Sequence, residues 1–232
     1  NDIAFLLGGK GSVSIGLLPN ADYPLVTRGL SHYLRQHPDL RVVVREGTLD
    51  DLLRNVETGD MDFFVGSVLV TRSSENLVSE VLIQARLIVV CRPNHPLADK
   101  PDLTFADLEG YGWVLPPRDT KIHQSFDEIL QEAGLEPPQT WIEINTFSVL
   151  RSILCDTDRL AIVVASRVSV ELDHGLLFAL PLVFSPNPFP IAVVRPEEER
   201  LSPWARGLLR SFRQAAVETK VAEAAYSGPT TA

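Results

Sequence analysis

The sequence predicts an α/β protein of two lobes, in which each lobe is a parallel β-sheet covered by helices on both faces. Short apolar strand patterns alternate with amphipathic helix patterns along nearly the whole chain, as they do in strand–helix–strand units. The strands are apolar almost throughout, which is typical of a parallel sheet buried on both faces. A proline-rich break, RPNHPLADKP (92–101), interrupts the alternation and marks the start of a second unit.

The first strand is GSVSIGLLP (11–19), and a helix follows it. Asn20 and Asp22 are good N-caps for this helix. Pro24 suits the first turn, where a missing N–H has no helical partner, and Pro38 ends the helix.

The same plan repeats directly afterwards. Residues 42–44 form a buried strand, and Thr48 with Asp51 matches a capping box at the start of the next helix. Gly59 suits the left-handed C-terminal position of that helix, and residues 63–66 form the following strand. A further apolar strand is expected over residues 83–91.

Three strand patterns, at 111–115, 141–145 and 160–164, belong to the second unit. A capping box of Thr104 and Asp107 opens a helix before the first of them. The helices between the strands begin at Asp119 or Thr120 and at Thr146.

The chain closes with a strand pattern over 176–184, a second proline-rich break at 185–190 and a strand from Ile191. The last helix begins at Ser202 and Pro203. After Val217 the pattern weakens into a frayed tail.

The composition indicates a globular protein and does not indicate that this chain itself binds nucleic acid. The chain has 232 residues, of which 45% are hydrophobic and 22% are charged, so most of it can form a buried core. Its 30 acidic and 21 basic residues give a net charge of −9. No stretch combines dense Lys and Arg with aromatic residues, as nucleic-acid surfaces do.

No membrane partner is expected, because no apolar run approaches the roughly 20 residues of a membrane helix. Cys91 and Cys155 lie in apolar patterns without metal-ligand spacing. This favours buried, reduced thiols and a cytoplasmic location.

Polar turns follow four of the predicted strands, at 20–22, 46–48, 118–121 and 145–146. Ligands of open parallel sheets bind beyond the carboxyl ends of the strands, where helix N-termini offer unpaired N–H groups. If the first two turns belong to one lobe and the last two to the other, they line a cleft. Such a cleft suits a small anionic or polyhydroxylated molecule.

These turns also have a purely structural explanation. Five residues can each act as an N-cap, which stabilises a helix by about 1 kcal/mol: Thr48, Thr104, Thr120, Thr146 and Ser202. We interpret Thr104 and Ser202 as caps alone and keep both interpretations open for the other three. Arg118 and Lys121 can likewise be cations of a solvated face.

No pattern predicts catalysis, a metal site or a cofactor, and we therefore expect a binding protein and not an enzyme. The five histidines are scattered, and none has the spacing of a metal-binding pair or lies beside a serine nucleophile motif. GGKGS (8–12) lacks the spacing of a phosphate-binding loop, because Gly11 follows Lys10.

Four stretches together resemble the effector-binding domain of LysR-type bacterial transcription regulators. They are GSVSIGLLP (11–19), LLRNVETGDMDFFVG (52–66), NHPLA (94–98) and SVLRSILCDTDRLAIVVAS (148–166). Each motif is weak alone, but their order and spacing are specific, and the resemblance covers nearly the whole chain.

The resemblance implies a periplasmic-binding-protein-like fold (type II), with two Rossmann-like lobes joined by a two-strand hinge at the proline-rich breaks. Lobe I would consist of residues 11–91 and 185–217, and lobe II of residues 92–184. Residues 1–10 would be the end of a linker from a missing DNA-binding segment, and residues 218–232 a tail.

The resemblance also implies a function. The domain would bind a small-molecule effector between its lobes and so control DNA binding by a missing N-terminal winged helix-turn-helix. The effector-binding residues would then be Asn20, Thr48, Ser67, Thr120, Lys121 and Thr146. The family often has Ser or Thr in the first turn, whereas this sequence has Asn20, Ala21 and Asp22, and an inward Asp22 would repel an anion.

The resemblance further implies a homodimer, in which the helix at 23–36 packs antiparallel on the partner's helix at 121–133. A tetramer is expected when the missing segment is present.

Two other functions fit the same fold. An exported solute-binding protein of a transporter shares the cleft but requires a signal peptide or lipid anchor upstream, and two cysteines without obvious pairing disfavour export. An enzyme requires a catalytic group in the cleft, for which Asp22 and Glu46 are the only carboxylate candidates.

Overall fold

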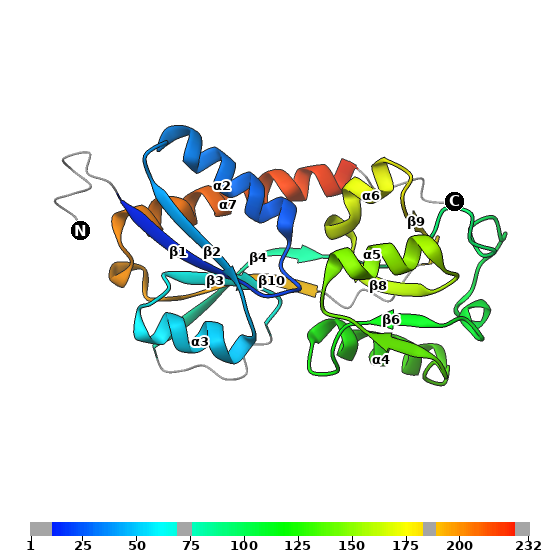
Figure 1. Cartoon of the computed structure of the whole chain (residues 1–232). Helices are drawn as coiled ribbons and strands as arrows, with labels where there is room; N and C mark the ends of the chain where they lie inside the picture. The colour runs from blue at the N-terminus through cyan, green and yellow to red at the C-terminus, as the bar shows by residue number, and fades with distance from the viewer. Residues whose placement is uncertain (1–10, 69–75, 183–188, 226–232) are drawn as a thin grey trace. The chain divides into compact units, whose positions relative to one another are not determined.

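Two structural units make up the chain in the computed structural model, which describes residues 11–68, 76–182 and 189–225 (Figure 1). Unit 1 comprises Asn1–Gln84 and Pro190–Ala232, and unit 2 comprises Ala85–Phe189. The expected linker end at 1–10 lies outside the described residues, as does most of the second proline-rich break.

Unit 1 is built on a five-stranded sheet with the strand order β2-β1-β3-β10-β4. The strands are β1 (Ser12–Leu17), β2 (Arg41–Glu46), β3 (Phe63–Gly66), β4 (Leu77–Ala85) and β10 (Phe189–Pro196). β1 pairs in parallel with both β2 and β3, as predicted. The expectation of an all-parallel sheet is wrong for β10, which is antiparallel to β3. The chain passes through β4 and unit 2 between β3 and β10, so the strand–helix–strand connection that gives parallel pairing does not join these two strands.

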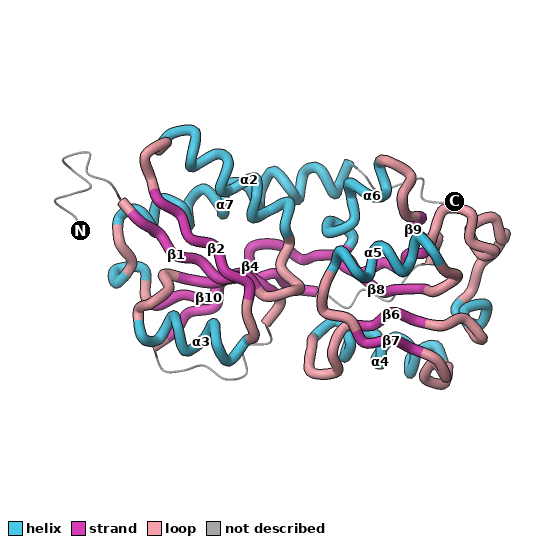
Figure 2. The backbone as a smooth tube through the Cα atoms, viewed as in Figure 1, coloured by secondary structure: helices cyan, strands magenta, loops and turns pink. Residues whose placement is uncertain are grey.

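The helices of unit 1 cover both faces of this sheet. α2 (Tyr23–Gln36) and α7 (Pro203–Ala225) run side by side over one face (Figures 1 and 2). α3 (Leu49–Thr58) covers the other face and packs there within an apolar cluster of Leu18, Leu52, Val56, Met61, Phe64 and Val194.

Two glycines allow α2 and α7 to approach closely. A Cβ atom on Gly29 would lie 2.2 Å from Cδ1 of Phe212, and a Cβ atom on Gly207 would lie 2.2 Å from the hydroxyl oxygen of Tyr33. Each helix therefore receives an aromatic ring of its partner over a glycine. The Phe212 ring also meets Phe63 of β3 edge to face, with the centroids 5.7 Å apart, and so joins the helix layer to the sheet.

The expected tail begins too early, because α7 continues to Ala225. Residues 226–232 of that tail lie outside the described residues. The sequence VETKVAEAA (217–225) contains no Gly or Pro and is rich in Ala, Glu and Lys, which favour helix. Thr219 is buried, and its hydroxyl accepts a hydrogen bond from Arg28 of α2 at 3.3 Å.

β2 also differs from its prediction as a buried strand. It is an edge strand, and none of its residues is fully buried; Val44 is 44% exposed. Apolar β-branched residues suit an edge strand as well as a central one, so composition alone could not separate the two.

Unit 2 has a second five-stranded sheet with the strand order β7-β6-β8-β5-β9. The strands are β5 (Leu87–Cys91), β6 (Trp113–Leu115), β7 (Trp141–Glu143), β8 (Leu160–Val164) and β9 (Phe178–Ala179). β6 pairs in parallel with β7 and β8, whereas β5 is antiparallel to β8 and β9. The strand predicted over 176–184 is the short β9, and residues 183 and 184 are outside the described part of the chain.

The single strand predicted over 83–91 is two strands. It breaks at Arg86, and β4 belongs to the sheet of unit 1 while β5 belongs to that of unit 2. The chain thus enters unit 2 after Gln84, before the proline-rich break that was expected to mark the hinge. An unbroken apolar run does not reveal a change of sheet, because both halves are buried.

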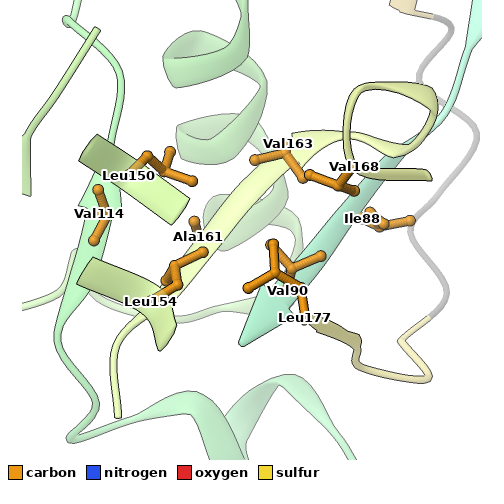
Figure 3. Packing of buried hydrophobic residues seen from close by; sticks show 9 residues of the cluster. All are labelled: Ile88, Val90, Val114, Leu150, Leu154, Ala161, Val163, Val168 and Leu177. Atoms are coloured by element: carbon orange, nitrogen blue, oxygen red, sulfur yellow. The ribbon is translucent and has the colours of Figure 1, made fainter. Parts of the chain in front are cut away.

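Unit 2 also carries helices on both faces of its sheet. α5 (Phe147–Asp156), η2 (Ala165–Val168) and α6 (Ser169–Asp173) lie on one side; η2 and α6 were not predicted. Figure 3 shows the core beneath them, formed by Ile88, Val90, Val114, Leu150, Leu154, Ala161, Val163, Val168 and Leu177. α4 (Lys121–Ala133) contacts the opposite face, where the rings of Phe126 and Trp113 lie 4.6 Å apart.

His95 joins two of the sequence motifs, NHPLA (94–98) and the stretch around Asp158. The Leu97 amide donates to Nδ1 of His95 at 3.1 Å, and Nε2 lies 3.2 Å from the Asp158 carbonyl oxygen. Because an amide only donates, Nδ1 is the acceptor and the proton is on Nε2. Burial lowers the pKa of His95 and favours this neutral form. Arg92 binds the Asp158 carboxylate at 2.7 Å.

An ion-pair network ties α7 to the sheet of unit 1. Nε and Nη2 of Arg213 donate to the two carboxylate oxygens of Glu80 in β4, at 2.7 and 2.8 Å. Nη2 of Arg213 also reaches Glu198 of η3 (Glu198–Arg200) at 3.0 Å, and Arg195 of β10 donates to Glu80 at 3.4 Å. The two-point geometry makes the Arg213–Glu80 pair strong for an ion pair that is partly exposed.

This network predicts a pH-dependent stability. The Arg213 hydrogen bonds hold the pKa of Glu80 below its ordinary value of 4.5. The stabilisation by Glu80 is therefore complete above that value and is lost as the pH falls through the lower pKa of the folded state. We expect Glu80→Gln to reduce the free energy of unfolding by about 1–2 kcal/mol at pH 7.

Urea unfolding between pH 3 and pH 7 measures the difference between wild type and the Glu80→Gln variant, which should shrink at acidic pH. Glu57→Gln on the exposed side of α3 is the matched control and should show no such difference. A constant gap across the whole pH range would contradict the assignment.

Candidate functional site

The two units repeat one chain order, in which a central strand pairs in parallel with a neighbour on each side. In unit 1 the order is β1-α2-β2-α3-β3, and in unit 2 it is β6-α4-β7-α5-β8. The carboxyl ends of these strands meet at one edge of each sheet. We call the turns after β1, β2 and β3 the unit 1 edge, and the turns after β6, β7 and β8 the unit 2 edge.

Backbone hydrogen bonds hold the turns of each edge together. The Gly47 amide donates to the Leu17 carbonyl oxygen at 3.1 Å, and the Leu18 amide donates to that of Val65 at 2.9 Å. At the unit 2 edge, the Ile144 amide donates to the Leu115 carbonyl oxygen at 2.8 Å. The predicted site residues therefore fall in two groups, with Asn20, Thr48 and Ser67 on the unit 1 edge and Thr120, Lys121 and Thr146 on the unit 2 edge.

Asn20 and Ser67 are in direct contact. Nδ2 of Asn20 donates to the Ser67 carbonyl oxygen at 3.2 Å, and the Ser67 amide donates to Oδ1 of Asn20 at 3.0 Å. Asn20 is 8% exposed and Ser67 is 5% exposed. The Asn20 amide thus replaces a missing pair of sheet hydrogen bonds where β3 ends. Within the described residues, the buried Ser67 hydroxyl has no hydrogen-bond partner.

The carboxylates of the unit 1 edge have local partners. Asp22 is fully buried, and its Oδ1 accepts from the Leu25 amide at 2.8 Å as the N-cap of α2. Oε2 of Glu46 accepts from the Tyr23 hydroxyl at 2.9 Å. The Asp22 carboxylate is therefore directed to the start of its own helix, and it remains one of the carboxylates of the unit 1 edge.

Thr48 acts as the predicted N-cap of α3. Its hydroxyl oxygen accepts from the Asp51 amide at 3.3 Å and donates to Oδ2 of Asp51 at 2.7 Å. Both hydrogen-bonding functions of this exposed hydroxyl therefore serve the first turn of the helix.

Thr120 has the same role in α4. Its hydroxyl oxygen accepts from the His123 amide at 3.3 Å and donates to the Pro117 carbonyl oxygen at 2.7 Å. The side chain of Lys121 is 11% exposed, and its ammonium lies 3.5 Å from Glu128, two turns further along α4. The Lys121 ammonium is thus directed along the helix.

Thr146 differs from the other threonines because it makes no side-chain capping bond to α5. Its exposed hydroxyl donates to Oδ1 of Asn145 at 3.2 Å. The ring of the next residue, Phe147, contacts Arg167, which the sequence analysis missed. The guanidinium carbon of Arg167 lies 5.1 Å from the centroid of the Phe147 ring. The signal for Arg167 was present in the sequence, since VVASR (163–167) follows β8 as VGSV (65–68) follows β3.

Neither a metal cluster nor a membrane span emerges from the structure. Among the described residues, no group of three or more His, Cys, Asp and Glu side chains could hold a metal ion. In the same part of the chain, no helix is both long enough and apolar enough to cross a membrane. Cys91 and Cys155 are free thiols. Cys91 is buried as expected, and burial raises its pKa to about 12. The expectation of a buried thiol is wrong for Cys155, which is exposed.

Comparison with known proteins identifies the class. The LysR substrate binding domain family matches residues 8–217. Two curated relatives are HTH-type transcriptional regulators: GalR of Pseudomonas putida KT2440, 31% identical over 209 residues, and GbpR of Azospirillum brasilense, 30% identical over 228 residues. These alignments cover 90% and 97% of this chain but 52% and 65% of the relatives. The chain thus spans about half to two thirds of their length.

A solved structure gives the same result for the fold. The effector-binding domain of BenM with its effector benzoate superposes with a TM-score of 0.71 and 22% identity, covering 95% of this chain and 96% of that one. The chain therefore has the periplasmic-binding-protein-like fold (type II). It belongs to the LysR family, as a LysR substrate binding domain.

The hydrogen bonds distinguish Asn20, whose side chain stabilises the fold, from Thr146, whose hydroxyl makes no capping bond. Asn20→Ala leaves the buried amide and carbonyl groups of Ser67 unpaired, so we expect it to lower the free energy of unfolding by about 1–3 kcal/mol. Thr146→Ala removes an exposed hydroxyl that caps no helix, and we expect a change within about 0.5 kcal/mol.

Urea unfolding of both variants tests this difference, with Thr120→Ala as a capping control expected to cost about 1 kcal/mol. A Thr146→Ala variant as unstable as Thr120→Ala would show that the Thr146 hydroxyl stabilises α5 after all.

Proposed function

We propose that this chain is the effector-sensing part of a DNA-binding transcriptional regulator. The match to the LysR substrate binding domain over residues 8–217 carries the proposal, and relatives named as HTH-type transcriptional regulators support it. In this proposal a winged helix-turn-helix segment outside this chain reads DNA. The acidic net charge of −9 fits a part that does not itself hold phosphates.

The effector binds at the carboxyl edges of the two sheets, with Asn20, Thr48 and Ser67 on one unit and Thr120, Lys121 and Thr146 on the other. Polar turns at helix N-termini are the usual ligand sites of such sheets. Because most of these hydroxyls are already committed to capping, Thr146 is the residue whose change reports on binding alone. That one effector contacts the turns of both units remains a prediction.

Binding would control DNA affinity only if the effector binds two conformations of the regulator unequally. A ligand with equal affinity for both states shifts no equilibrium. The regulator would act in the cytoplasm, where Cys91 and Cys155 stay reduced.

Thermal unfolding with a panel of sugars, sugar acids and aromatic acids tests effector binding. A ligand at 100 times its dissociation constant should stabilise the folded chain by roughly 2.7 kcal/mol. Thr146→Ala should reduce the shift caused by a true effector without changing the melting temperature of the free protein. No shift across a broad panel, for a chain shown to be folded, would contradict an accessible effector site.

We further propose a homodimer in which α2 of one protomer packs antiparallel on α4 of the other, and a tetramer of the longer protein. The charges of the two helices are complementary. α2 carries Arg28 and Arg35 and no acidic residue, whereas α4 carries Asp127, Glu128 and Glu132 against the single cation Lys121. Arg35 and these three carboxylates are exposed. Opposite charges on two faces favour their association over that of like faces.

Sedimentation equilibrium tests this interface. Arg35→Glu should weaken the dimer several-fold, and moderate salt should weaken the wild-type dimer in the same direction. Arg54→Glu on the exposed side of α3 is the matched control and should leave the dimer unchanged. If neither salt nor Arg35→Glu changes the dimer dissociation constant, the interface does not involve these charges and lies elsewhere.

A further inference from the structure

We propose that Arg167 binds the anionic group of the effector and so makes the domain select organic carboxylates over uncharged molecules. This inference rests on the proposed effector-binding function. It concerns unit 2 alone, where Arg167 lies in η2 directly after β8.

The position of Arg167 in the chain order supports a ligand-binding role. β8 is to unit 2 what β3 is to unit 1, since each pairs in parallel with the central strand of its sheet. The turn after β3 contains Ser67, and the corresponding turn after β8 contains Ser166 and Arg167. Arg167 therefore occupies the third turn of the unit 2 edge, next to the turn after β6.

Contacts bring Arg167 to the polar turn after β7. Its guanidinium carbon lies 5.1 Å from the centroid of the Phe147 ring, and Phe147 directly follows Asn145 and Thr146. A guanidinium held on an aromatic face loses less conformational freedom when it binds a carboxylate than a free side chain does. The planar fork of Arg167 can form two parallel bonds to a carboxylate. The exposed Asn145 and Thr146 side chains directly precede Phe147 in the chain.

The charges of the two edges direct an anion to unit 2. Arg118, Lys121 and Arg167 lie in or beside the turns of the unit 2 edge, against the carboxylates Asp119 and Glu143, and the Arg86 carbonyl oxygen accepts from the Ala165 amide after β8. Lys121 pairs with Glu128 along α4, and Arg118 lies on the Trp141 ring at the β7 margin of the sheet. Arg167 follows β8, which is an interior strand of the sheet. The unit 1 edge offers the carboxylates Asp22 and Glu46.

Matched pairs of ligands test the proposal on the 232-residue chain. Each pair is a carboxylate and an uncharged relative: benzoate with benzamide, gluconate with glucose, and galactonate with galactose. Thermal unfolding identifies the pair that binds, and isothermal calorimetry gives its dissociation constants. We expect the acid to bind and its uncharged relative to bind far more weakly.

Arg167→Gln should then raise the dissociation constant of the acid about tenfold to a hundredfold, as the loss of a charged hydrogen bond requires. Arg167→Lys should retain part of the affinity, because it keeps the charge but loses the planar fork. Arg54→Gln on α3 is the control, since it removes an exposed guanidinium that lies on neither edge, and it should bind like wild type. Urea midpoints of all variants report whether they remain folded.

Two results would overturn the proposal while leaving effector sensing intact. In the first, the uncharged relative binds as tightly as its acid. In the second, Arg167→Gln leaves the dissociation constant of the acid unchanged. A folded chain that binds no member of any pair would count against both the carboxylate preference and the proposed effector site.

Discussion

Parallel pairing of one central strand with a neighbour on each side is the constraint on which both units depend. β1 pairs in parallel with β2 and β3, and β6 pairs in parallel with β7 and β8. Because the chain crosses over the sheet once in each direction, right-handed connections place successive helices on opposite faces. α2 and α3 therefore cover different faces of one sheet, and the turns that join strands to helices gather at a single edge. α7 packs beside α2, and Gly29 and Gly207 allow the two helices to approach closely.

The need to satisfy polar groups then decides which residues of that edge remain available to a ligand. Asn20 holds the end of β3, while Asp22, Thr48 and Thr120 hold the first turns of their helices. Thr146 alone among the nominated threonines makes no side-chain cap to its helix, and it directly precedes Phe147, whose ring contacts the Arg167 guanidinium. A polar residue at a helix start is thus a weak indicator of binding until its hydrogen bonds are known.

Local patterns predicted the elements well because their signals are local. Gly59 and Gly134 end helices in the left-handed conformation, and Thr48, Thr120 and Ser202 cap helices as their spacing indicated. Three features depend on partners far away in the sequence and cannot be predicted from a local pattern. They are the direction of β10, the change of sheet at Arg86 and the exposure of β2. Ser67 was found only through the family resemblance. Arg167 was missed because its signal is the repeat between the two units, in which the turn after β8 corresponds to the turn after β3, and not a feature of its own turn.

The order of the chain has a consequence for synthesis of the protein. Unit 2 is inserted into unit 1, and the sheet of unit 1 is completed by β10, which pairs Val65 with Val193. A ribosome that has released the residues up to Gln84 has supplied neither β10 nor α7. Unit 2 is contiguous and can finish folding first, because domains fold as they emerge. Until the last helix leaves the ribosome, Phe63 lacks Phe212 and the edge of β3 stays open to other strands. The nascent chain is most exposed to aggregation during this interval.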